Sequence, residues 1–457
     1  MQQKTYLKWY NKIGYGSGDI AGNVVWALLN FFIMIYLTDT VGLNSGIVGT
    51  LMAVSKIFDG VTDIFFGTMI DKTKSKMGKA RPWMLWPYIG NSICLAACFA
   101  IPMDWSQGAQ YAFFFIAYTM LNGVFYTANN IAYGALTALI TKNDSERVQM
   151  GSLRFIFANA SSLVIQAVTV GFVAAMGGGA EGWKWAAIIY SIIGLVVNTI
   201  SVFSVKELPE SELEHQNKEE EPKEKITLKE AFKLVASNKY YMLLTCIYLI
   251  IHICNGFTGV GIFYMTYVLG DANLMGTFAS ATNIFMIIGL LAAPLVIKKM
   301  GGMYKINLWG YSFATLCRVL VMVGGYMGNV PMMLIFTALA NIGMSPLQGD
   351  LNALIACASE YTYLTKGKRI DGTMYSCTSL GVKIGGGLGT AISGWLLAAA
   401  GFIEGGAAVQ PESVITMLNV MYLWLPAILS GLIALVLSRM NVEQANAKLL
   451  QEASLKS

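Results

Sequence analysis

Four residues within one apolar stretch, Lys56, Asp59, Thr62 and Asp63, have the types and spacing of a cation site. At about 100° per residue, Lys56, Asp59 and Asp63 fall on one side of a helix. Two carboxylates one turn apart repel each other unless a positive charge lies between them. A bound Na⁺ or proton supplies that charge, and the Thr62 hydroxyl adds a neutral oxygen of the kind that hard cations prefer. The alternative is a static salt bridge from Lys56 to one aspartate, which leaves the second carboxylate unexplained.

Other polar and charged side chains interrupt apolar stretches in which they have no reason to face lipid. Their amides, hydroxyls and charges can hydrogen-bond a polar ligand in a cavity. The set comprises Asp19, Asn23, Tyr126, Thr127, Asn129, Asn130 and Arg154. Two interpretations of Arg154 stay open: its guanidinium lines the cavity, or it extends to the membrane surface.

Lys383 lies within a glycine-rich stretch, 381–389, too deep in its predicted helix to reach the membrane surface easily. It therefore needs an acidic or hydroxyl-rich partner. The glycines lack the strand and the Lys-Ser/Thr pattern of a nucleotide-binding loop, so they indicate close packing between helices. Asp350 can pair with either Lys383 or Arg318.

The composition identifies the setting in which these residues act. Hydrophobic residues make up 55% of the 457-residue chain and charged residues 12%, against about 25% charged residues in ordinary soluble domains. This balance excludes a disordered, collagen-like or nucleic-acid-binding chain, and it leaves too few polar groups for the surface of a soluble enzyme. The sequence also lacks a Ser/His/Asp set and a nucleophile elbow, so we do not expect an enzyme.

The seven cysteines all lie in apolar stretches, and only two histidines occur. This usage predicts neither a disulfide framework nor a cluster of metal-ligating side chains. We expect no cofactor, and Na⁺ or H⁺ enters only as a coupling ion.

Apolar segments long enough to cross a hydrocarbon layer of about 30 Å recur along the whole chain. We predict twelve transmembrane helices, at 14–37, 44–70, 82–102, 108–140, 149–176, 184–204, 239–269, 273–297, 305–326, 331–356, 371–400 and 412–439. Most of the 31 basic residues then fall on one side, which places both termini in the cytoplasm. An ionisable side chain at the bilayer centre costs ~2.5–3.5 kcal/mol, so charges inside the spans point to function.

The long polar segment 206–238 divides the spans into two groups of six. We predict an N-terminal bundle over 1–205, a cytoplasmic central loop over 206–238, a C-terminal bundle over 239–440 and a cytoplasmic tail over 441–457. The central loop is interpreted as a solvated linker, with a regulatory docking site as the alternative. The fold class is an all-α polytopic membrane protein in which two six-helix bundles form the major facilitator fold, with the substrate near the midplane.

Several motifs in this order resemble those of the glycoside–pentoside–hexuronide:cation symporters, the family of the melibiose carrier. The resemblance covers nearly the whole chain. The motifs are Gly18-Asp19-x-x-x-Asn23, Tyr36-Leu-Thr-Asp39-x-x-Gly42, Lys56-Ile-Phe-Asp59-Gly-Val-Thr62-Asp63, Gly78-Lys79-Ala-Arg81-Pro82-Trp83 and Lys366-Gly367-Lys368-Arg369-Ile-Asp-Gly372.

The resemblance implies sugar uptake into the cell across the inner membrane, driven by Na⁺ or H⁺ through alternating access, with a sugar as substrate and membrane lipid as surroundings. Asp59 and Asp63 match the paired carboxylates of the cation site, where Thr62 and Thr127 supply further oxygen ligands. The implied sugar-binding residues are Asp19, Asn23, Tyr126, Asn130, Arg154 and Lys383. We expect a single chain to be the functional unit.

Two departures from the family pattern affect the expected substrate. Asn23 and Asn130 stand where the melibiose carrier has two sugar-binding aspartates, so they add no negative charge opposite Arg154. An unneutralised Arg154 and Lys383 can meet the carboxylate of an acidic sugar. Asp19, one turn before Asn23, can instead restore one of the lost charges.

Two other functions are compatible with this architecture. A Na⁺-coupled carrier of lysolipids shares the fold and the cation site, but it needs an apolar lateral slot, whereas the polar residues above favour sugar. A membrane sugar sensor binds its ligand without transporting it, and it needs a larger soluble segment than the central loop provides.

Overall fold

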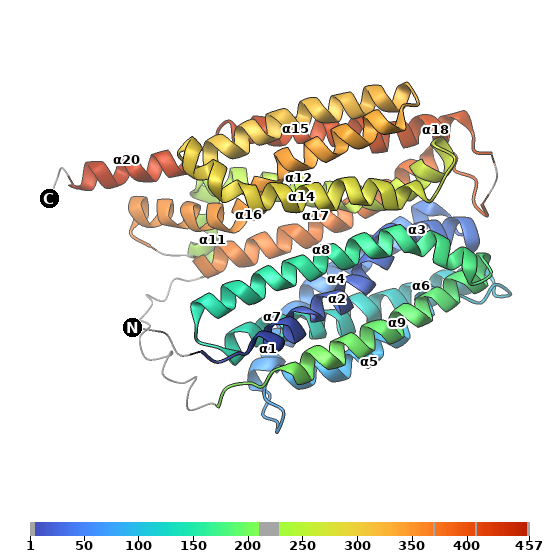
Figure 1. The fold of residues 1–457 in the computed structure, drawn as a ribbon, viewed down its shortest axis with the longest axis horizontal. Coiled ribbons are helices and arrows are strands. Elements are labelled where there is room, and N and C mark those ends of the chain that lie inside the picture. The colour runs from blue at the N-terminus through green and yellow to red at the C-terminus, as the bar shows by residue number, and fades with distance from the viewer. Residues whose placement is uncertain (1–4, 210–227, 369–370, 407–408, 455–457) are drawn as a thin grey trace. The chain divides into compact units, whose positions relative to one another are not determined.

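The computed structural model describes the chain except for residues 1–4, 210–227, 369–370, 407–408 and 455–457 (Figure 1). Most of the predicted central loop, and Arg369 and Ile370 of the last motif, therefore lie outside the described residues. The chain forms two compact units. The N-unit comprises Met1–Lys223 with Thr390–Pro411, and the C-unit comprises Glu224–Gly389 with Glu412–Ser457.

The N-unit contains helical segments at each of the first six predicted spans. The first span is interrupted by π-helical turns, and the fourth is divided by one. In chain order the segments are α1 (Trp9–Gly16), α2 (Gly18–Ala27), η1 (Leu28–Phe32), α3 (Ile33–Ile35), η2 (Tyr36–Thr40), α4 (Ser45–Lys72), α5 (Arg81–Cys98), α6 (Gln107–Met120), η3 (Leu121–Tyr126), α7 (Thr127–Ile140), α8 (Asp144–Ala175) and α9 (Gly179–Ser204).

The C-unit contains the helices of the remaining spans, and α17 continues from it into the N-unit. The segments are α11 (Leu228–Ser237), α12 (Lys239–Gly256), η5 (Phe257–Gly259), α13 (Val260–Phe263), η6 (Tyr264–Val268), α14 (Leu274–Met300), α15 (Met303–Tyr326), α16 (Val330–Lys366), α17 (Asp371–Ala399), α18 (Glu412–Asn419), η7 (Val420–Trp424), α19 (Leu425–Leu437) and α20 (Val442–Ser454).

Ten helical stretches of the described chain are long and apolar enough to cross a membrane. The two predicted spans that this criterion omits are α4 and α5. Lys56, Asp59 and Asp63 reduce the apolarity of α4, while Arg81 and two prolines reduce that of the 18-residue α5. Both helices are nevertheless present at the predicted positions. The residues that make α4 less apolar are the charged residues predicted to form the cation site.

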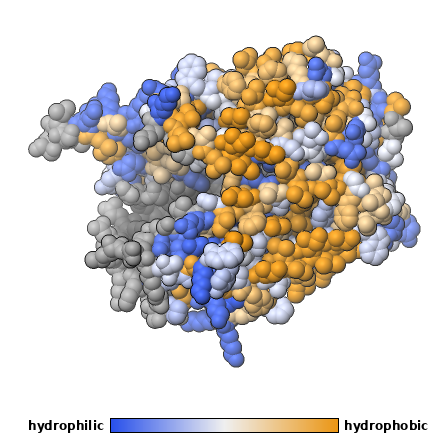
Figure 2. Space-filling view, viewed as in Figure 1, coloured by the Kyte–Doolittle hydropathy of each residue, from blue (hydrophilic) through white to orange (hydrophobic). Residues whose placement is uncertain are grey.

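The flanks of the helices expose apolar side chains. On α9, Ile192, Ile193, Val196, Ile200 and Phe203 are each 44–59% exposed along the helix. Figure 2 shows apolar side chains over the middle of the helices and hydrophilic side chains gathered towards the helix ends. Such a surface is stable in hydrocarbon and would be unfavourable in water.

Glu207 fixes the beginning of α5, where the motif Gly78–Trp83 lies. Its carboxylate accepts hydrogen bonds from the backbone N–H groups of Lys79, Ala80 and Arg81, at 2.6, 2.9 and 3.0 Å. These are donors that a helix N-terminus leaves without partners. Gly78 has φ +110°, and a Cβ atom there would lie 2.3 Å from the Glu207 carboxyl carbon. This motif therefore has a structural role, in which the glycine makes room for the capping carboxylate.

Candidate functional site

Two of the predicted cation residues, Asp59 and Thr127, meet where α4 packs against η3 and α7. Asp59, Thr62 and Asp63 lie on α4 and are each half-buried, while Thr127 begins α7 and is only 3% exposed. The preceding turn, η3, is π-helical, a distortion that occurs frequently at functional sites. The Thr127 hydroxyl contacts the Asp59 carboxylate as a hydrogen-bond partner, across 68 positions of sequence. The structure thus joins Asp59 and Thr127, which the sequence placed in different spans.

More oxygen atoms than protons meet at Thr127. Its Oγ1 atom lies 2.8 Å from the Asn122 carbonyl oxygen as well as against Asp59 Oδ1. A hydroxyl carries one proton and can donate to only one of these two acceptors. A positive charge beside Asp59 stabilises the other oxygen–oxygen contact, and a bound cation, a proton or the ammonium of Lys56, which interacts electrostatically with Asp59, can supply it.

Thr62 is oriented so that its oxygen can serve as a ligand. Its hydroxyl lies within hydrogen-bond distance of carbonyl oxygens of its own helix, 3.1 Å from Asp59 O and 3.3 Å from Phe58 O. The proton is thereby directed at the backbone, which leaves lone pairs of Oγ1 for a cation. Lys56, one turn before Asp59, donates a hydrogen bond of 3.2 Å to Thr390 within the N-unit.

Among the described residues, no group of three or more His, Cys, Asp or Glu side chains is arranged to hold a metal ion. The donor set predicted on α4 and α7 is different, since it consists of two carboxylates and two hydroxyls. Such an all-oxygen set suits a hard monovalent cation or a proton better than a transition metal.

A second polar cluster lies where α2 packs against α8. Arg154 Nε donates a hydrogen bond of 2.7 Å to Asp19 Oδ2, and a second nitrogen lies 3.4 Å from Oδ1. The side chains are 26% and 17% exposed, so the pair is largely buried yet accessible. Of the two interpretations of Arg154, the one in which it lines the interior is therefore the one the geometry favours, and Asp19 supplies the negative charge opposite it.

Tyr133 completes this cluster and was missed in the sequence. Its hydroxyl lies 2.9 Å from Asp19 Oδ2, and its ring lies under the guanidinium of Arg154, 4.1 Å from the Cζ atom. A cation over an aromatic face is stabilised by the ring's quadrupole. The spacing in the sequence could have indicated Tyr133, since it follows Tyr126 by seven residues and so lies on the same face of the helix.

Tyr126 interacts electrostatically with residues of both clusters. Its hydroxyl is within electrostatic range of Asp19, Arg154 and Asp59. Asn130, one turn later, is exposed, whereas the amide nitrogen of Asn23 donates 2.9 Å back to the carbonyl of Asp19. Among the described residues, the Asn130 amide therefore remains open to a ligand, and Asn23 offers mainly its oxygen.

Asn129, which the sequence grouped with the cavity residues, has a structural role instead. It is 6% exposed, and its amide nitrogen donates to Met84 O at 2.7 Å and to Asn198 Oδ1 at 3.1 Å. Asn198 donates 2.9 Å to the same carbonyl. These bonds tie α7 to α5 and α9, so Asn129 does not support a sugar site.

The C-unit contains the remaining predicted residues. Lys383 is half-buried on α17, and the glycines after it pack closely on α12, as predicted: a Cβ at Gly389 would lie 2.3 Å from Ile253 O. Asp350 accepts a hydrogen bond of 3.0 Å from Asn307, and the Arg318 Nε atom is buried without a hydrogen bond to any described residue. The sequence left Arg318 and Lys383 open as partners of Asp350, and Asn307 on α15 is a hydrogen-bond partner that it did not indicate.

A family model described as MFS/sugar transport protein matches residues 14–444. The chain is 26% identical to the isoprimeverose transporter of Lactiplantibacillus pentosus, over 99% of this chain and 93% of that protein. It is 27% identical to the putative glycoside/cation symporter YagG of Escherichia coli (strain K12), over 99% of this chain and 96% of that protein.

Solved structures show the same fold at lower sequence identity. The nucleoside transporter NupG is similar with a TM-score of 0.61 at 12% identity, covering 94% of this chain and 98% of its own. A bacterial homologue of the human lysosomal transporter Spinster, in an inward-facing and occupied conformation, has a TM-score of 0.67 at 12% identity, covering 97% and 99%. These likenesses establish the major facilitator fold of this chain.

Proposed function

Since the chain belongs to the family of MFS/sugar transport proteins, we propose that it couples the entry of Na⁺ or H⁺ to the uptake of a glycoside or oligosaccharide by alternating access. The family and the relatives named above are multi-pass membrane transporters, so the prediction that the chain is not an enzyme is confirmed. The coupling ion and the class of sugar are the parts that we propose.

The contact between Asp59 and Thr127 carries the proposal for ion coupling. Three oxygen atoms, on Asp59, Thr127 and Asn122, converge around one hydroxyl proton. A cation bound beside Asp59 is stabilised by the carboxylate and by the neutral oxygens around it. The ammonium of Lys56, which also interacts electrostatically with Asp59, is the alternative counter-charge. Asp63, one turn further along α4, adds a second negative charge to the same helix face.

Tyr126 supports coupling between the ion and the sugar, because its hydroxyl interacts electrostatically with both Asp59 and the Asp19–Arg154 pair. Cation binding at Asp59 changes the field at the sugar-binding residues, and sugar binding changes the field at the cation. The coupling must be reciprocal, so that each ligand tightens the other by the same factor. Each positive charge that moves inward also gains ~2.3 kcal/mol per 100 mV of membrane potential.

The pairing of Arg154 with Asp19 favours a neutral sugar over a hexuronide. An unpaired Arg154 was the main reason to consider an acidic substrate, and here its charge is already balanced at 2.7 Å. A neutral pair with exposed edges offers donors and acceptors to sugar hydroxyls, and Asn130 and Asn23 add amide groups.

We place both termini in the cytoplasm, because the basic residues at the helix ends lie predominantly on that side. A single chain is proposed as the functional unit, since Asp59, Thr127, Asp19 and Arg154 all belong to one N-unit. No residue of a second chain is needed to assemble either cluster.

The test is accumulation of labelled sugars by cells or vesicles that contain the Asp59→Cys or Asp63→Cys variant, with and without Na⁺ at two pH values. We expect both variants to lose accumulation against a gradient. Asp104→Cys, which removes an exposed carboxylate outside the site, is the matched control and should accumulate normally. Uphill accumulation by both site variants would overturn the proposed cation site, and uptake of lysophospholipid without uptake of any sugar would overturn the proposed substrate.

A further inference from the structure

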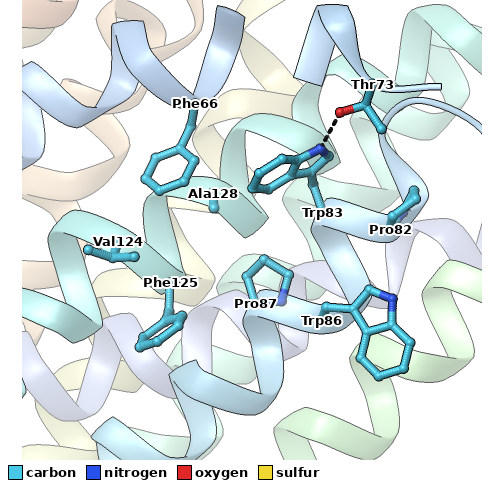
Figure 3. Close-up of a pocket in the computed structure, with 9 residues that line it drawn as sticks. All are labelled: Phe66, Thr73, Pro82, Trp83, Trp86, Pro87, Val124, Phe125 and Ala128. Carbon is cyan, nitrogen blue, oxygen red and sulfur yellow. Dashed lines mark hydrogen bonds between the residues drawn. The ribbon is translucent and has the colours of Figure 1, made fainter. Parts of the chain in front are cut away.

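An apolar recess of about 490 Å³ lies on the N-unit, outside the two polar clusters. Helices α4 and α5, with the η3–α7 segment, form its walls (Figure 3). Its lining is almost entirely aromatic, proline or aliphatic: Phe66, Thr73, Pro82, Trp83, Trp86, Pro87, Val124, Phe125 and Ala128. The Trp83 indole N–H donates a hydrogen bond of 2.7 Å to the Thr73 hydroxyl. Such a lining suits a hydrocarbon chain.

A second hollow of about 470 Å³ begins at the same Thr73 and has the opposite character. It is formed by the turn after α4 and by the segment that follows α9. Five basic side chains and one carboxylate line it: Lys74, Lys76, Lys79, Arg81, Lys206 and Glu207. The Glu207 carboxylate already accepts hydrogen bonds from three backbone N–H groups at the start of α5, so its hydrogen-bonding capacity is used by the helix N-terminus. The lysines thus give this hollow a surplus of positive charge.

The two hollows share Thr73, and Arg81 in one is adjacent in sequence to Pro82 in the other. An apolar recess that continues into a basic hollow at a helix end has the chemistry of one ligand, an anionic headgroup attached to an acyl chain. We propose that the N-unit binds an anionic phospholipid here, with an acyl chain against Trp86 and Phe125 and the phosphate among Lys74, Lys76 and Lys206.

The lipid surroundings favour this occupant over a free phosphate. Anionic lipids attract basic residues at the membrane surface by about 1 kcal/mol per Lys or Arg, and a basic pocket beside transmembrane helices concentrates that attraction. Trp86 is 64% exposed, so the recess opens on the flank of the unit, where hydrocarbon lies in a membrane. A free phosphate would use the basic hollow but would leave the apolar recess without a function.

The site is also separate from the transport chemistry. None of Asp19, Asp59, Thr127 and Arg154 lines either hollow. Its links to transport are the η3–α7 segment, in which Phe125 and Ala128 flank Tyr126 and Thr127, and α4, which carries Phe66. Helix α4 ends beside Thr73 after carrying Asp59 and Asp63 earlier in the helix. A bound lipid therefore contacts the helix that bears the cation residues without occupying the proposed site.

The experiment measures lipid binding to the full chain by native mass spectrometry, with phosphatidylglycerol and phosphatidylcholine of the same acyl chains. We expect phosphatidylglycerol to bind at least about tenfold more tightly, since several lysines act together. Lys74→Gln/Lys76→Gln should reduce that preference to about twofold or less. Val124→Phe, which fills the recess, should weaken both lipids while keeping their ratio.

The matched control is Lys299→Gln/Lys305→Gln, which removes one exposed lysine at the end of α14 and one at the start of α15. It should bind phosphatidylglycerol like the wild type. Millimolar inorganic phosphate should not displace the lipid. Equal affinity for the two lipids, equal losses in the two lysine variants, or displacement by phosphate would each overturn the proposal. The lysine variants change only exposed side chains at residues 74, 76, 299 and 305, so they test the site even if Val124→Phe does not fold.

Discussion

Arg154 on α8 and Asp19 on α2 form an ion pair with an Nε–Oδ2 distance of 2.7 Å across 135 positions of sequence. The pair is covered on one side by the ring of Tyr133 and remains accessible on another. It joins two helices of the N-unit and at the same time presents polar edges to a ligand. Its strength can therefore be measured separately from transport.

We predict a coupling free energy of about 1–3 kcal/mol for this pair, because both groups are largely buried and charged. The measurement is a double-mutant cycle of unfolding in detergent, with Asp19→Asn, Arg154→Gln and the double variant. Glu181 and Lys184, an exposed pair at 2.9 Å on one helix, provide the control. Their coupling should be at most about 0.5 kcal/mol. Equal coupling in both cycles would contradict the buried role of Asp19 and Arg154.

Thr127 allows a test of the cation ligands by single-atom changes. We predict that Thr127→Val raises the cation concentration for half-maximal uptake about tenfold or more, since it removes an oxygen that faces Asp59. Thr127→Ser keeps the hydroxyl and should stay within about twofold. Thr119→Val is the matched control, because its buried hydroxyl has no partner among the described residues. The ligand role is refuted if Thr127→Val and Thr119→Val shift the cation dependence equally.

Asn129 and Asn130 are adjacent in sequence, yet we predict opposite phenotypes. Asn129→Ala should lower the free energy of unfolding by about 1–3 kcal/mol, because Asn198 and Met84 lose their buried partner. The KM for sugar of the folded variant should be unchanged. Asn130→Ala should leave stability unchanged and raise KM, since its amide is exposed. Thermal unfolding and initial uptake rates distinguish the two, and a raised KM for Asn129→Ala with normal stability would reverse the assignment.

The environment of Glu146 leads to a prediction about how the free energy of unfolding changes in acid. It lies before the span Gln149–Ala175, and burial raises its pKa. Hydrogen bonds from Thr141, at 2.6 Å, and from the backbone of Leu7 and Tyr6 outweigh burial, as does Lys12 at 3.4 Å. The net effect holds the pKa of Glu146 below its ordinary value of 4.5.

Because the folded-state pKa of Glu146 is depressed, its stabilisation is present above the unfolded pKa and is lost as the pH falls through the folded pKa. We expect the thermal unfolding midpoint of the wild type to decrease when the pH is lowered below about 4.5. Glu146→Gln should be less stable at pH 7 and should show a smaller further loss in acid. Glu181→Gln, which changes an exposed carboxylate, is the control. Parallel pH curves for wild type and Glu146→Gln would contradict the prediction.

The amino-acid sequence by itself determined the helices and the face that carries Asp59, Thr62 and Asp63. Both depend on local periodicity, since side chains three and four residues apart share a helix face whatever surrounds them. The motif order also determined the family, because several spaced patterns rarely coincide by chance. The close packing of the glycines after Lys383 followed from the same local logic.

Tertiary structure decided which polar residues meet. Asn129 and Asn130 look alike in sequence, but helix packing turns the first towards Met84 and Asn198 and leaves the second exposed. Packing likewise placed Asn307 beside Asp350, and Tyr133 beneath Arg154. These contacts join residues far apart in the chain, and their geometry depends on how whole helices rotate and approach. A periodic pattern fixes the direction of a side chain on its own helix, but the neighbouring helix decides what it touches.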